Sequence, residues 1–149
     1  MKAGGKVRFT DIELEYSDIL WFAVDRNGCL AGFTSGGTLF VPEFVRKSKE
    51  ETELLETFFC AQLPAVTQYV LDVPDKENGL ISDSKMLSEK GLFCFDLPDA
   101  HDAVYKRVCS PLIPLCLDSL PVDFMKIMQC HRLEVDFRTA QTVQVKKGC

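Results

Sequence analysis

The sequence predicts an α+β fold: a largely antiparallel (mixed) sheet of about six to eight strands, with about three helices packed on it. Two observations lead to this class. Short apolar runs bounded by turn residues recur along the chain, as is typical of strands joined in hairpins. A few longer segments instead have apolar residues at helical spacing behind a capping residue. The strands are mostly sequential, with helices inserted between them, which favours antiparallel pairing.

The clearest strand pair is a β-hairpin within DILWFAVDRNGCLAGFTSGG, residues 18–37. Ile19 to Val24 and Cys29 to Phe33 are apolar runs, and the turn between them contains Asn27 and Gly28. These two residue types tolerate the positive φ of a tight hairpin turn. Because the first run does not alternate with polar residues, we expect both of its faces to be covered and its strand to be central in the sheet.

The clearest helix is expected from Ser48 to Leu63. Ser48 is a favourable N-cap residue, and Glu51 stands three positions later, as in a capping box. Pro64 ends the helix. Residues at helical spacing predict one apolar stripe that faces the core: Leu54, Leu55, Phe58, Phe59 and Gln62 or Leu63.

The stretch Thr10 to Tyr16 fits two structures. Thr10 and Glu13 resemble a capping box, which favours a helix. Apolar and acidic residues also alternate along this stretch with the period of a strand, and we favour the strand. A further short strand is expected at Lys6 to Phe9.

The rest of the chain alternates between strands and helices. One helix is expected from Ser82 or Asp83 to Lys90, where Gly91 supplies the left-handed residue that ends many helices, and another from Pro121 to Gln129. Strands are expected at Val66–Val73, Leu92–Asp96, Ala103–Cys109 and Arg132–Arg138, the last with a hairpin partner around Val143 and Val145.

Length and composition predict one soluble globular domain, residues 1–149. The hydrophobic fraction is 46%, the charged fraction is 26%, and the net charge is −5. No Lys/Arg cluster is dense enough for a phosphate-binding surface, so we expect no nucleic-acid partner. No apolar run is long enough to span a bilayer, and the N-terminus has no apolar segment of the signal-peptide type. We therefore expect a cytoplasmic protein that does not bind membranes.

The seven cysteines are predicted to be reduced. Their number is odd, none has C-x-x-C spacing, and most lie inside apolar runs. A thiol nucleophile requires an electropositive and partly exposed place. Cys109, which follows Lys106 and Arg107, comes nearest to that description, but a buried structural role is the preferred interpretation.

Neither a metal nor a cofactor is expected. Cys130 and His131 are adjacent rather than spaced as zinc ligands, and we interpret them as a core cysteine followed by a surface histidine. Ser35 to Thr38 does not match a phosphate-binding loop, and Asp75 to Gly79 departs from the EF-hand pattern. Both are interpreted as turns.

Two further features have a functional and a structural interpretation. Asp25 and Asp96 each end an apolar run, so their carboxylates could meet at one sheet edge and titrate as a pair. Aspartates at strand ends also commonly accept hydrogen bonds from their own turn, and this is the preferred interpretation. Trp21, the one tryptophan, lies within an apolar run and is expected in the core.

The segments DILWFAVDRNGCLAGFTSGG with VPEFV, and GLFCFD with YKRVCSPLIPL and LP, resemble a family of small uncharacterised bacterial proteins. That family shares a D-x-x-W-F-A-V-D-x-x-G hairpin, a G-L-F-x-[FY]-D strand and a Pro-rich segment before a late helix. Such proteins are similar in character to the small acidic immunity proteins that are paired with bacterial toxins. The resemblance thus implies toxin neutralisation and assigns no catalytic residue.

These observations favour a non-enzymatic protein-binding module, with another protein, such as a basic toxin, as its partner. The alternatives are a small enzyme of unrecognised type, using strand-end carboxylates or a Cys–His pair, and a structural subunit that works only as an oligomer. Acidic residues crowd the expected exposed side of the first long helix and one loop, and such a patch would steer a basic partner. The candidate partner-binding residues are Glu50, Glu53, Glu56, Asp96, Asp99 and Asp102.

Overall fold

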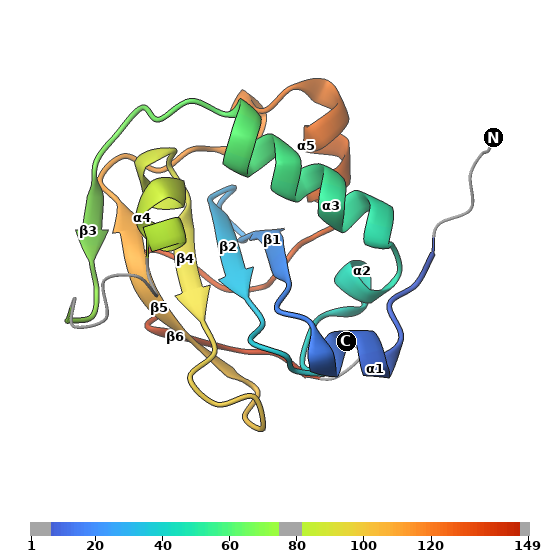
Figure 1. Ribbon diagram of the computed structural model, residues 1–149. Coiled ribbons are helices and arrows are strands. Elements are labelled where there is room, and N and C mark those ends of the chain that lie inside the picture. Colours follow the sequence, from blue (N-terminus) through green and yellow to red (C-terminus); the bar gives the residue numbers. More distant parts are fainter. Residues whose placement is uncertain (1–6, 75–81, 147–149) are drawn as a thin grey trace.

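The computed structural model describes residues 7–74 and 82–146 and shows the α+β fold that the sequence predicts (Figure 1). Six strands form one mixed sheet with the order β1-β2-β4-β5-β3, and β6 also pairs with β5. All strand pairs are antiparallel except β2–β4, which is parallel. The strands are β1 (Leu20–Val24), β2 (Leu30–Thr34), β3 (Tyr69–Leu71), β4 (Phe93–Asp96), β5 (Val104–Pro111) and β6 (Thr142–Gln144).

The described residues form five α-helices, two more than the three strong sequence signals because two of the five are short. A π-helical turn, Phe58–Gln62, continues α3 directly, and a 3₁₀ turn, Leu117–Ser119, precedes α5. The helices are α1 (Asp11–Tyr16), α2 (Glu43–Arg46), α3 (Lys49–Thr57), α4 (Ser82–Glu89) and α5 (Val122–Gln129). None of the helices in the described part of the chain is long and apolar enough to cross a membrane.

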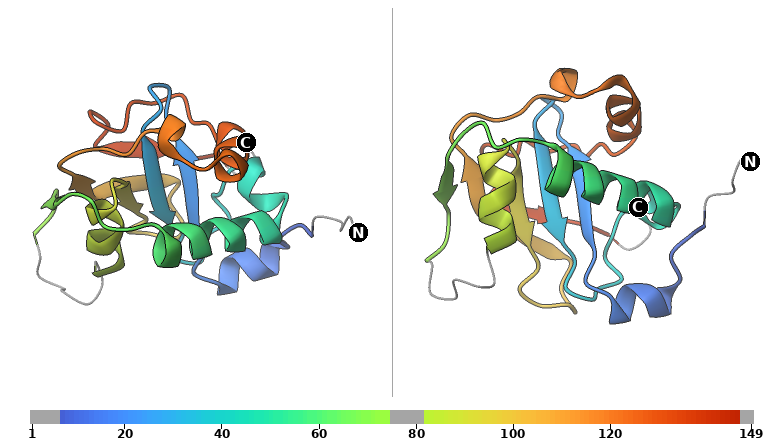
Figure 2. Two further views of the ribbon diagram at one scale, coloured as in Figure 1. Left: turned by 90° about the horizontal axis from the view of Figure 1, so that it is seen from above. Right: turned by 45° about the horizontal axis from the view of Figure 1, so that its top comes forward.

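Both faces of the sheet are covered. Figures 1 and 2 show α3 and α4 lying across one face. There Leu55 of α3 and Leu87 of α4 pack with Phe22 of β1 in one apolar cluster. Trp21 and Phe33 point to the opposite face, where they pack with Phe137 and other residues in a second cluster. Successive residues of a strand point to opposite faces, so the unbroken apolar run of β1 supplies both cores.

The hairpin β1–β2 is confirmed, but the prediction that β1 is central is wrong. β1 is the last strand at one end of the sheet, and β2 lies between β1 and β4. The outer side of β1 is covered by the segment after α5: Val24 N–H donates to the carbonyl of His131, and Leu133 N–H donates to the carbonyl of Val24. The apolar run therefore correctly predicted that both faces of β1 are covered, but it did not predict the position of β1 in the sheet.

The hairpin turn also differs in detail. Gly28 has φ +87°, whereas no non-glycine residue in the described chain, Asn27 included, has a positive φ. Gly28 N–H donates to the carbonyl of Asp25, as in a type I turn followed by a left-handed glycine.

The N-terminal residues form a helix, so the strand favoured for Thr10 to Tyr16 is wrong. The Thr10 hydroxyl accepts from Glu13 N–H, and the Glu13 carboxylate accepts from Thr10 N–H, which completes the capping box of α1. Ile12, which the strand pattern would place in the core, is 70% exposed. The described residues 7–9 are not a strand either; Phe9 N–H donates instead to the carbonyl of Arg46, the last residue of α2.

The strand expected at Arg132–Arg138 is also absent from the described structure. Only Arg132 forms an isolated bridge, with Val24. The alternation that suggested a strand survives as alternating burial, because this segment packs on the sheet with Phe137 buried and Leu133 and Val135 partly buried. The expected hairpin partner, β6, pairs with β5 instead.

The remaining predicted elements are confirmed within a few residues. Ser48 caps α3 by accepting from Glu51 N–H at 3.1 Å, and Gly91, with φ +105°, follows α4. One residue of the expected α3 stripe is misplaced: Leu54 is 48% exposed, whereas Leu55, Phe58 and Phe59 are buried.

Candidate functional site

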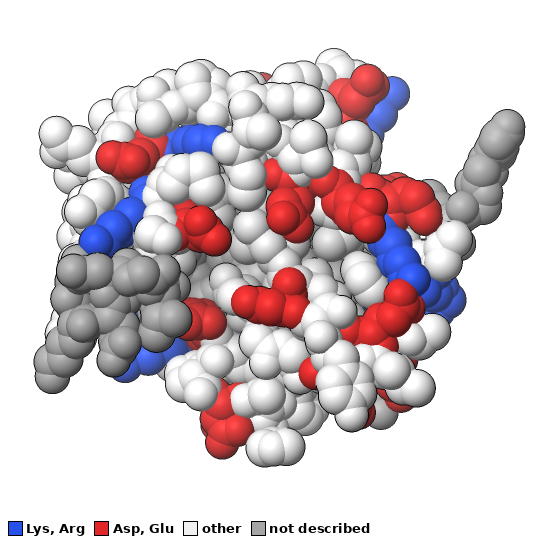
Figure 3. All heavy atoms as spheres, in the orientation of Figure 1, with Lys and Arg blue, Asp and Glu red and all other residues white. Residues whose placement is uncertain are grey.

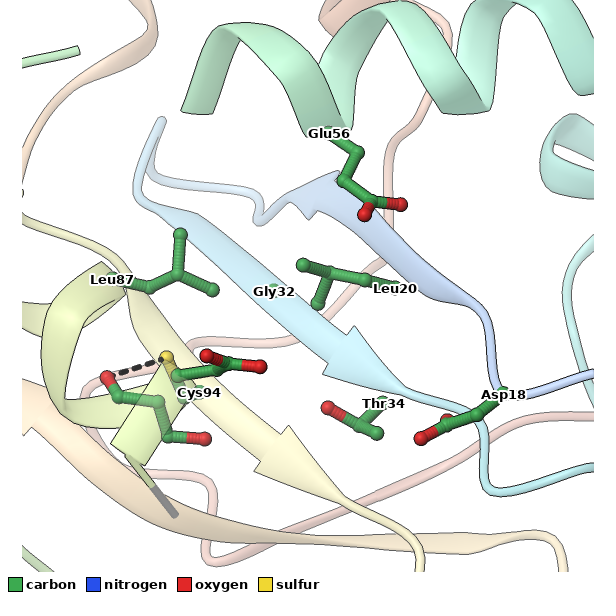
Figure 4. Close-up of a pocket in the computed structure, with 9 residues that line it drawn as sticks. Asp18, Leu20, Gly32, Thr34, Glu56, Leu87 and Cys94 are labelled. Atoms are coloured by element: carbon green, nitrogen blue, oxygen red, sulfur yellow. Dashed lines mark hydrogen bonds between the residues drawn. The ribbon is translucent and has the colours of Figure 1, made fainter. Parts of the chain in front are cut away.

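An acidic pocket of about 150 Å³ lies between α3, α4 and the sheet face that these helices cover (Figure 4). Its floor comes from the strands, and its rim comes from the helices and from Asp18, two residues before β1. We call this site the acidic pocket. Its lining residues are Asp18, Leu20, Gly32, Thr34, Glu56, Asp83, Ser84, Leu87 and Cys94.

The floor follows from strand register. Leu20 of β1 pairs with Thr34 of β2, which pairs in turn with Asp96 of β4. Paired residues of neighbouring strands share a face, so Asp96 lies next to the pocket on its side of the sheet. Gly32 keeps the floor open, because a Cβ there would lie 3.3 Å from the Phe22 ring and 3.4 Å from the Leu87 methyl group.

Three carboxylates from separate segments form the rim. Figure 4 shows Glu56 pointing from α3 toward the sheet, and Asp18 pointing from the start of β1 toward Thr34. The Asp18 carboxylate also accepts a hydrogen bond from Gly36 N–H at 2.9 Å, which ties it to the turn after β2. Asp83 belongs to the first turn of α4.

The surroundings of the pocket disfavour the ionised form of its own carboxylates. Partial burial raises the pKa of Glu56, and the neighbouring carboxylates of Glu53, Asp83 and Asp18 raise it further. Burial also raises the pKa of Asp96, with a further contribution from Asp18, although the hydrogen bond from Leu97 N–H opposes the shift. None of the described lining residues is basic. Figure 3 shows the acidic side chains over α3 and around the hollow beside it.

The six candidate partner-binding residues come from α3, from the end of β4 and from the loop after β4. Glu53 and Glu56 are exposed on α3, and Asp96 lies next to the pocket. The Glu50 carboxylate accepts from Val7 N–H at 2.7 Å, so it holds the N-terminal segment. Asp99 and Asp102 lie in the loop between β4 and β5 and accept from backbone N–H groups of that loop.

The loop after β4 borders a second pocket of about 480 Å³, beside α1. Tyr16 and His101 lie on its wall, and both are exposed. It contains fewer charged groups than the acidic pocket, and only one of its lining residues, Glu15, carries a carboxylate.

The pairing of Asp25 with Asp96 is wrong. β1 runs antiparallel to β2, which runs parallel to β4, so the ends of β1 and β4 lie at opposite edges of the sheet. The residue brought toward Asp96 is Asp18, which precedes β1. Asp25 is fully buried, and its carboxylate accepts three backbone hydrogen bonds, from Asn27, Cys29 and Phe137, so its role is structural.

The metal and thiol candidates are placed differently from expectation. Cys130 is exposed and His131 is buried, the reverse of the predicted arrangement. The His131 ring stacks on Phe44, and its Nδ1 lies 3.0 Å from the carbonyl oxygen of Phe22. Among the described residues, no three His, Cys, Asp or Glu side chains are grouped to hold a metal. Cys109 is fully buried and its pKa is raised by burial, so it is not a nucleophile accessible to a substrate.

The other sequence candidates are structural where they are described. Ser35 to Thr38 contains a turn in which Gly36 and Gly37 both have positive φ. Trp21 is in the core: its ring stacks on Phe33 with centroids 4.1 Å apart and is 1% exposed. The Asp75 to Gly79 segment lies outside the described residues.

Sequence reasoning missed Asp18 and Asp83. Asp18 directly precedes an apolar strand and Asp83 lies in a helical first turn, where acidic residues are common for local reasons. They reach one pocket only because β2 pairs parallel with β4 and because α4 packs on the same sheet face as α3. Comparisons of the chain with family models, curated proteins and solved structures gave no match.

Proposed function

We propose that the protein is a non-enzymatic binding module that recognises a basic segment of another protein, with a lysine or arginine side chain of that partner in the acidic pocket. The observation that carries this proposal is the convergence of Asp18, Glu56 and Asp83 on one pocket without a basic residue among its described lining. A partner cation would supply the missing positive charge.

The raised pKa of Glu56 gives the physical reason for binding. Burial and like charges make the ionised carboxylate costly in the free protein. A cation placed between Glu56, Asp83 and Asp18 removes that repulsion and adds charge-assisted hydrogen bonds. The hydroxyls of Thr34 and Ser84 line the same pocket and offer further acceptors.

The size of the pocket supports a side chain as its occupant. Its volume of about 150 Å³ is below the roughly 300–1,000 Å³ that is typical of small-molecule sites. The exposed Glu53 on α3 extends the negative surface beyond the rim, where it would meet the rest of a basic partner. Neutralisation of a basic bacterial toxin, as the sequence resemblance implies, is the specific form of this function that we propose.

Binding of labelled peptides tests the proposal. Fluorescence anisotropy would compare an oligo-arginine, an oligo-lysine and an oligo-glutamate peptide at low and high salt. We expect the basic peptides to bind, with affinity that falls as salt rises. The triple variant Asp18→Asn, Glu56→Gln, Asp83→Asn should bind them at least about tenfold more weakly.

A matched control removes the same charge from other elements. Asp118→Asn, Asp123→Asn and Glu134→Gln together neutralise three exposed carboxylates outside the pocket. We expect this variant to keep most of the affinity of the wild type. Equal losses in the two triple variants would mean that net charge alone attracts the peptides, and the pocket would then have no specific role.

A small enzyme is the second candidate, because a carboxyl with a raised pKa next to a pocket is typical of a general acid or base. Asp96, a strand-end carboxylate, meets that description. A screen of model esters and phosphoesters tests it. Turnover that is lost in Asp96→Asn, and kept in Asp99→Asn, would favour the enzyme over the binding module.

A further inference from the structure

Cys29 and Cys116 lie directly opposite each other although they are far apart in the sequence. Cys29 follows the hairpin turn, just before β2, and Cys116 lies in the connector that leads to the 3₁₀ turn before α5. The two residues form an isolated antiparallel bridge. Both are free thiols in the structure.

The hydrogen bonds around the bridge define the type of pair. Leu117 N–H donates to the carbonyl of Gly28 at 2.8 Å, so this bond flanks the two cysteines and does not join them. The backbone N–H and carbonyl of Cys29 are both bonded to Asp25 instead. In a non-hydrogen-bonded antiparallel pair the Cα atoms are about 4.5 Å apart, the closer of the two spacings. That spacing lies within the Cα range of disulfides, about 4.4–6.8 Å.

The two thiols of the pair differ in their exposure to solvent. Cys116 is exposed, whereas Cys29 is only 2% exposed. The guanidinium of Arg138 lies beside the Cys29 thiol and also interacts with Cys116. Burial raises the pKa of Cys29, and the contact with Arg138 opposes that rise. Arg138 therefore stabilises negative charge on sulfur at this place.

We propose that Cys29 and Cys116 are a site of reversible thiol–disulfide exchange with small soluble disulfides. The thiolate of Cys116 attacks one sulfur of the small disulfide, forms a mixed disulfide and releases the first small thiolate. The thiolate of Cys29 then attacks Sγ of Cys116 and releases the second. Both cysteine protons leave to water or to the released thiolates, and the two electrons reduce the small disulfide to two thiols. This activity is independent of the acidic pocket.

A second cross-strand cysteine pair serves as an internal comparison. Cys94 of β4 and Cys109 of β5 are also register partners, but both are buried. The Cys94 thiol donates to the Ser84 carbonyl at 3.3 Å, and burial raises its pKa to about 12. Because neither thiol is accessible, we expect this pair to stay reduced under conditions that oxidise Cys29 and Cys116.

Oxidised glutathione provides the test. Fully reduced protein is incubated with it, quenched in acid, denatured, alkylated at the remaining thiols and mapped by peptide mass spectrometry. We expect the peptides that contain Cys29 and Cys116 to be linked, with Cys94, Cys109 and Cys130 alkylated. Alkylation of all seven cysteines after oxidation would overturn the proposal, as would glutathione retained on Cys116 beside an alkylated Cys29.

Single variants separate the two steps. Cys29→Ser should accumulate glutathione on Cys116, because the thiol that would displace it is missing. In Cys116→Ser, an exposed and conservative change, Cys29 should remain reduced because it is buried. Cys130→Ser should leave the linkage as in the wild type. Oxidation of Cys29 at the wild-type rate in Cys116→Ser would contradict the proposed order.

Arg138→Gln tests the role of the cation. We expect it to slow displacement of glutathione by Cys29 several-fold, and Lys126→Gln, which removes an exposed charge from α5, to have no such effect. The linkage should also raise the melting temperature of the wild type by roughly 5 °C or more, because it closes a long loop. The same oxidation should leave the melting temperature of Cys116→Ser unchanged. Linked peptides without a rise in melting temperature would place the linkage in unfolded chains and overturn the native site.

Discussion

The carboxylate of Asp25, at the end of the first hairpin strand, accepts a hydrogen bond of 2.8 Å from the backbone N–H of Phe137, 112 positions later in the chain. The same carboxylate accepts from Asn27 and Cys29 in its own turn. One buried side chain therefore fixes the turn and attaches the C-terminal segment to it. The carboxylate adds to the backbone hydrogen bonds, such as the one from Leu133 N–H to the Val24 carbonyl, that join this segment to β1.

Asp25→Ala should destabilise the protein by about 3 kcal/mol or more, because it leaves buried backbone N–H groups without an acceptor. Asp123→Ala, at an exposed position of α5, should cost less than about 1 kcal/mol. Urea unfolding followed by circular dichroism measures both. Similar losses in the two variants would mean that the three hydrogen bonds of Asp25 contribute little.

Trp21→Ala should cost roughly 3–5 kcal/mol, through lost burial and the cavity left between Phe33, Phe44 and Tyr105. Leu54→Ala is the matched control, since Leu54 is a large apolar residue that is half exposed on α3. It should change stability by no more than about 0.5 kcal/mol. Thermal and urea unfolding of both variants check the difference. A Trp21 variant that melts with the wild type would make Trp21 a contact residue.

Gly91→Ala and Gly28→Ala separate backbone conformation from crowding. Both glycines have positive φ, but a Cβ at Gly28 meets nothing within 4 Å, whereas one at Gly91 would lie 2.6 Å from the Leu115 Cβ. Gly28→Ala should cost about 1–2 kcal/mol for the left-handed backbone. Gly91→Ala should cost about 3 kcal/mol or more, because the clash is added. Equal costs, measured by urea unfolding, would show that Leu115 moves aside easily.

Glu56→Gln should change the pH dependence of stability. The raised pKa of Glu56 means that the folded protein keeps this proton to higher pH than the unfolded chain does. Protonated Glu56 therefore contributes stability to the folded protein. This contribution is fully present below the ordinary glutamate pKa of 4.5, and it is lost as the pH rises through the pKa that Glu56 has in the folded protein. At about pH 7 the variant should therefore melt above the wild type, and the gain should disappear below pH 4.5.

Glu134→Gln controls for the change in net charge in this experiment, since it removes one exposed carboxylate outside the pocket. Melting temperatures of the wild type and both variants across the pH range provide the comparison. If Glu56→Gln melts below the wild type at neutral pH, the Glu56 carboxylate makes a favourable contact and the electrostatic account of the pocket is wrong.

Local signals in the sequence determined several elements by themselves. The hairpin followed from two apolar runs around a turn with Gly28, and α3 followed from the Ser48 cap. Gly91 marked the end of α4 because few other residues adopt its positive φ. In each case the physical cause lies within a few residues of its effect, so the chain alone contains it.

Tertiary structure decided what depends on pairing between distant segments. The apolar pattern of β1 records that both faces are buried, and it is the same for a central strand and for an end strand covered by the segment around His131 and Leu133. Likewise, the alternation of residues at Arg132 to Arg138 predicts which side chains are buried. It does not predict how the backbone of this segment bonds to a neighbouring strand.

The candidate site, too, was decided by the tertiary structure. Glu56 and Asp96 were identified from the sequence, but their partners Asp18 and Asp83 become neighbours only because β2 pairs parallel with β4 and α4 covers the same sheet face as α3. Cys29 meets Cys116 and Arg138 for the same kind of reason. Residue type determines which chemistry is available at a position. The pairing of segments far apart in the chain determines which positions meet, and no local sequence signal encodes that pairing.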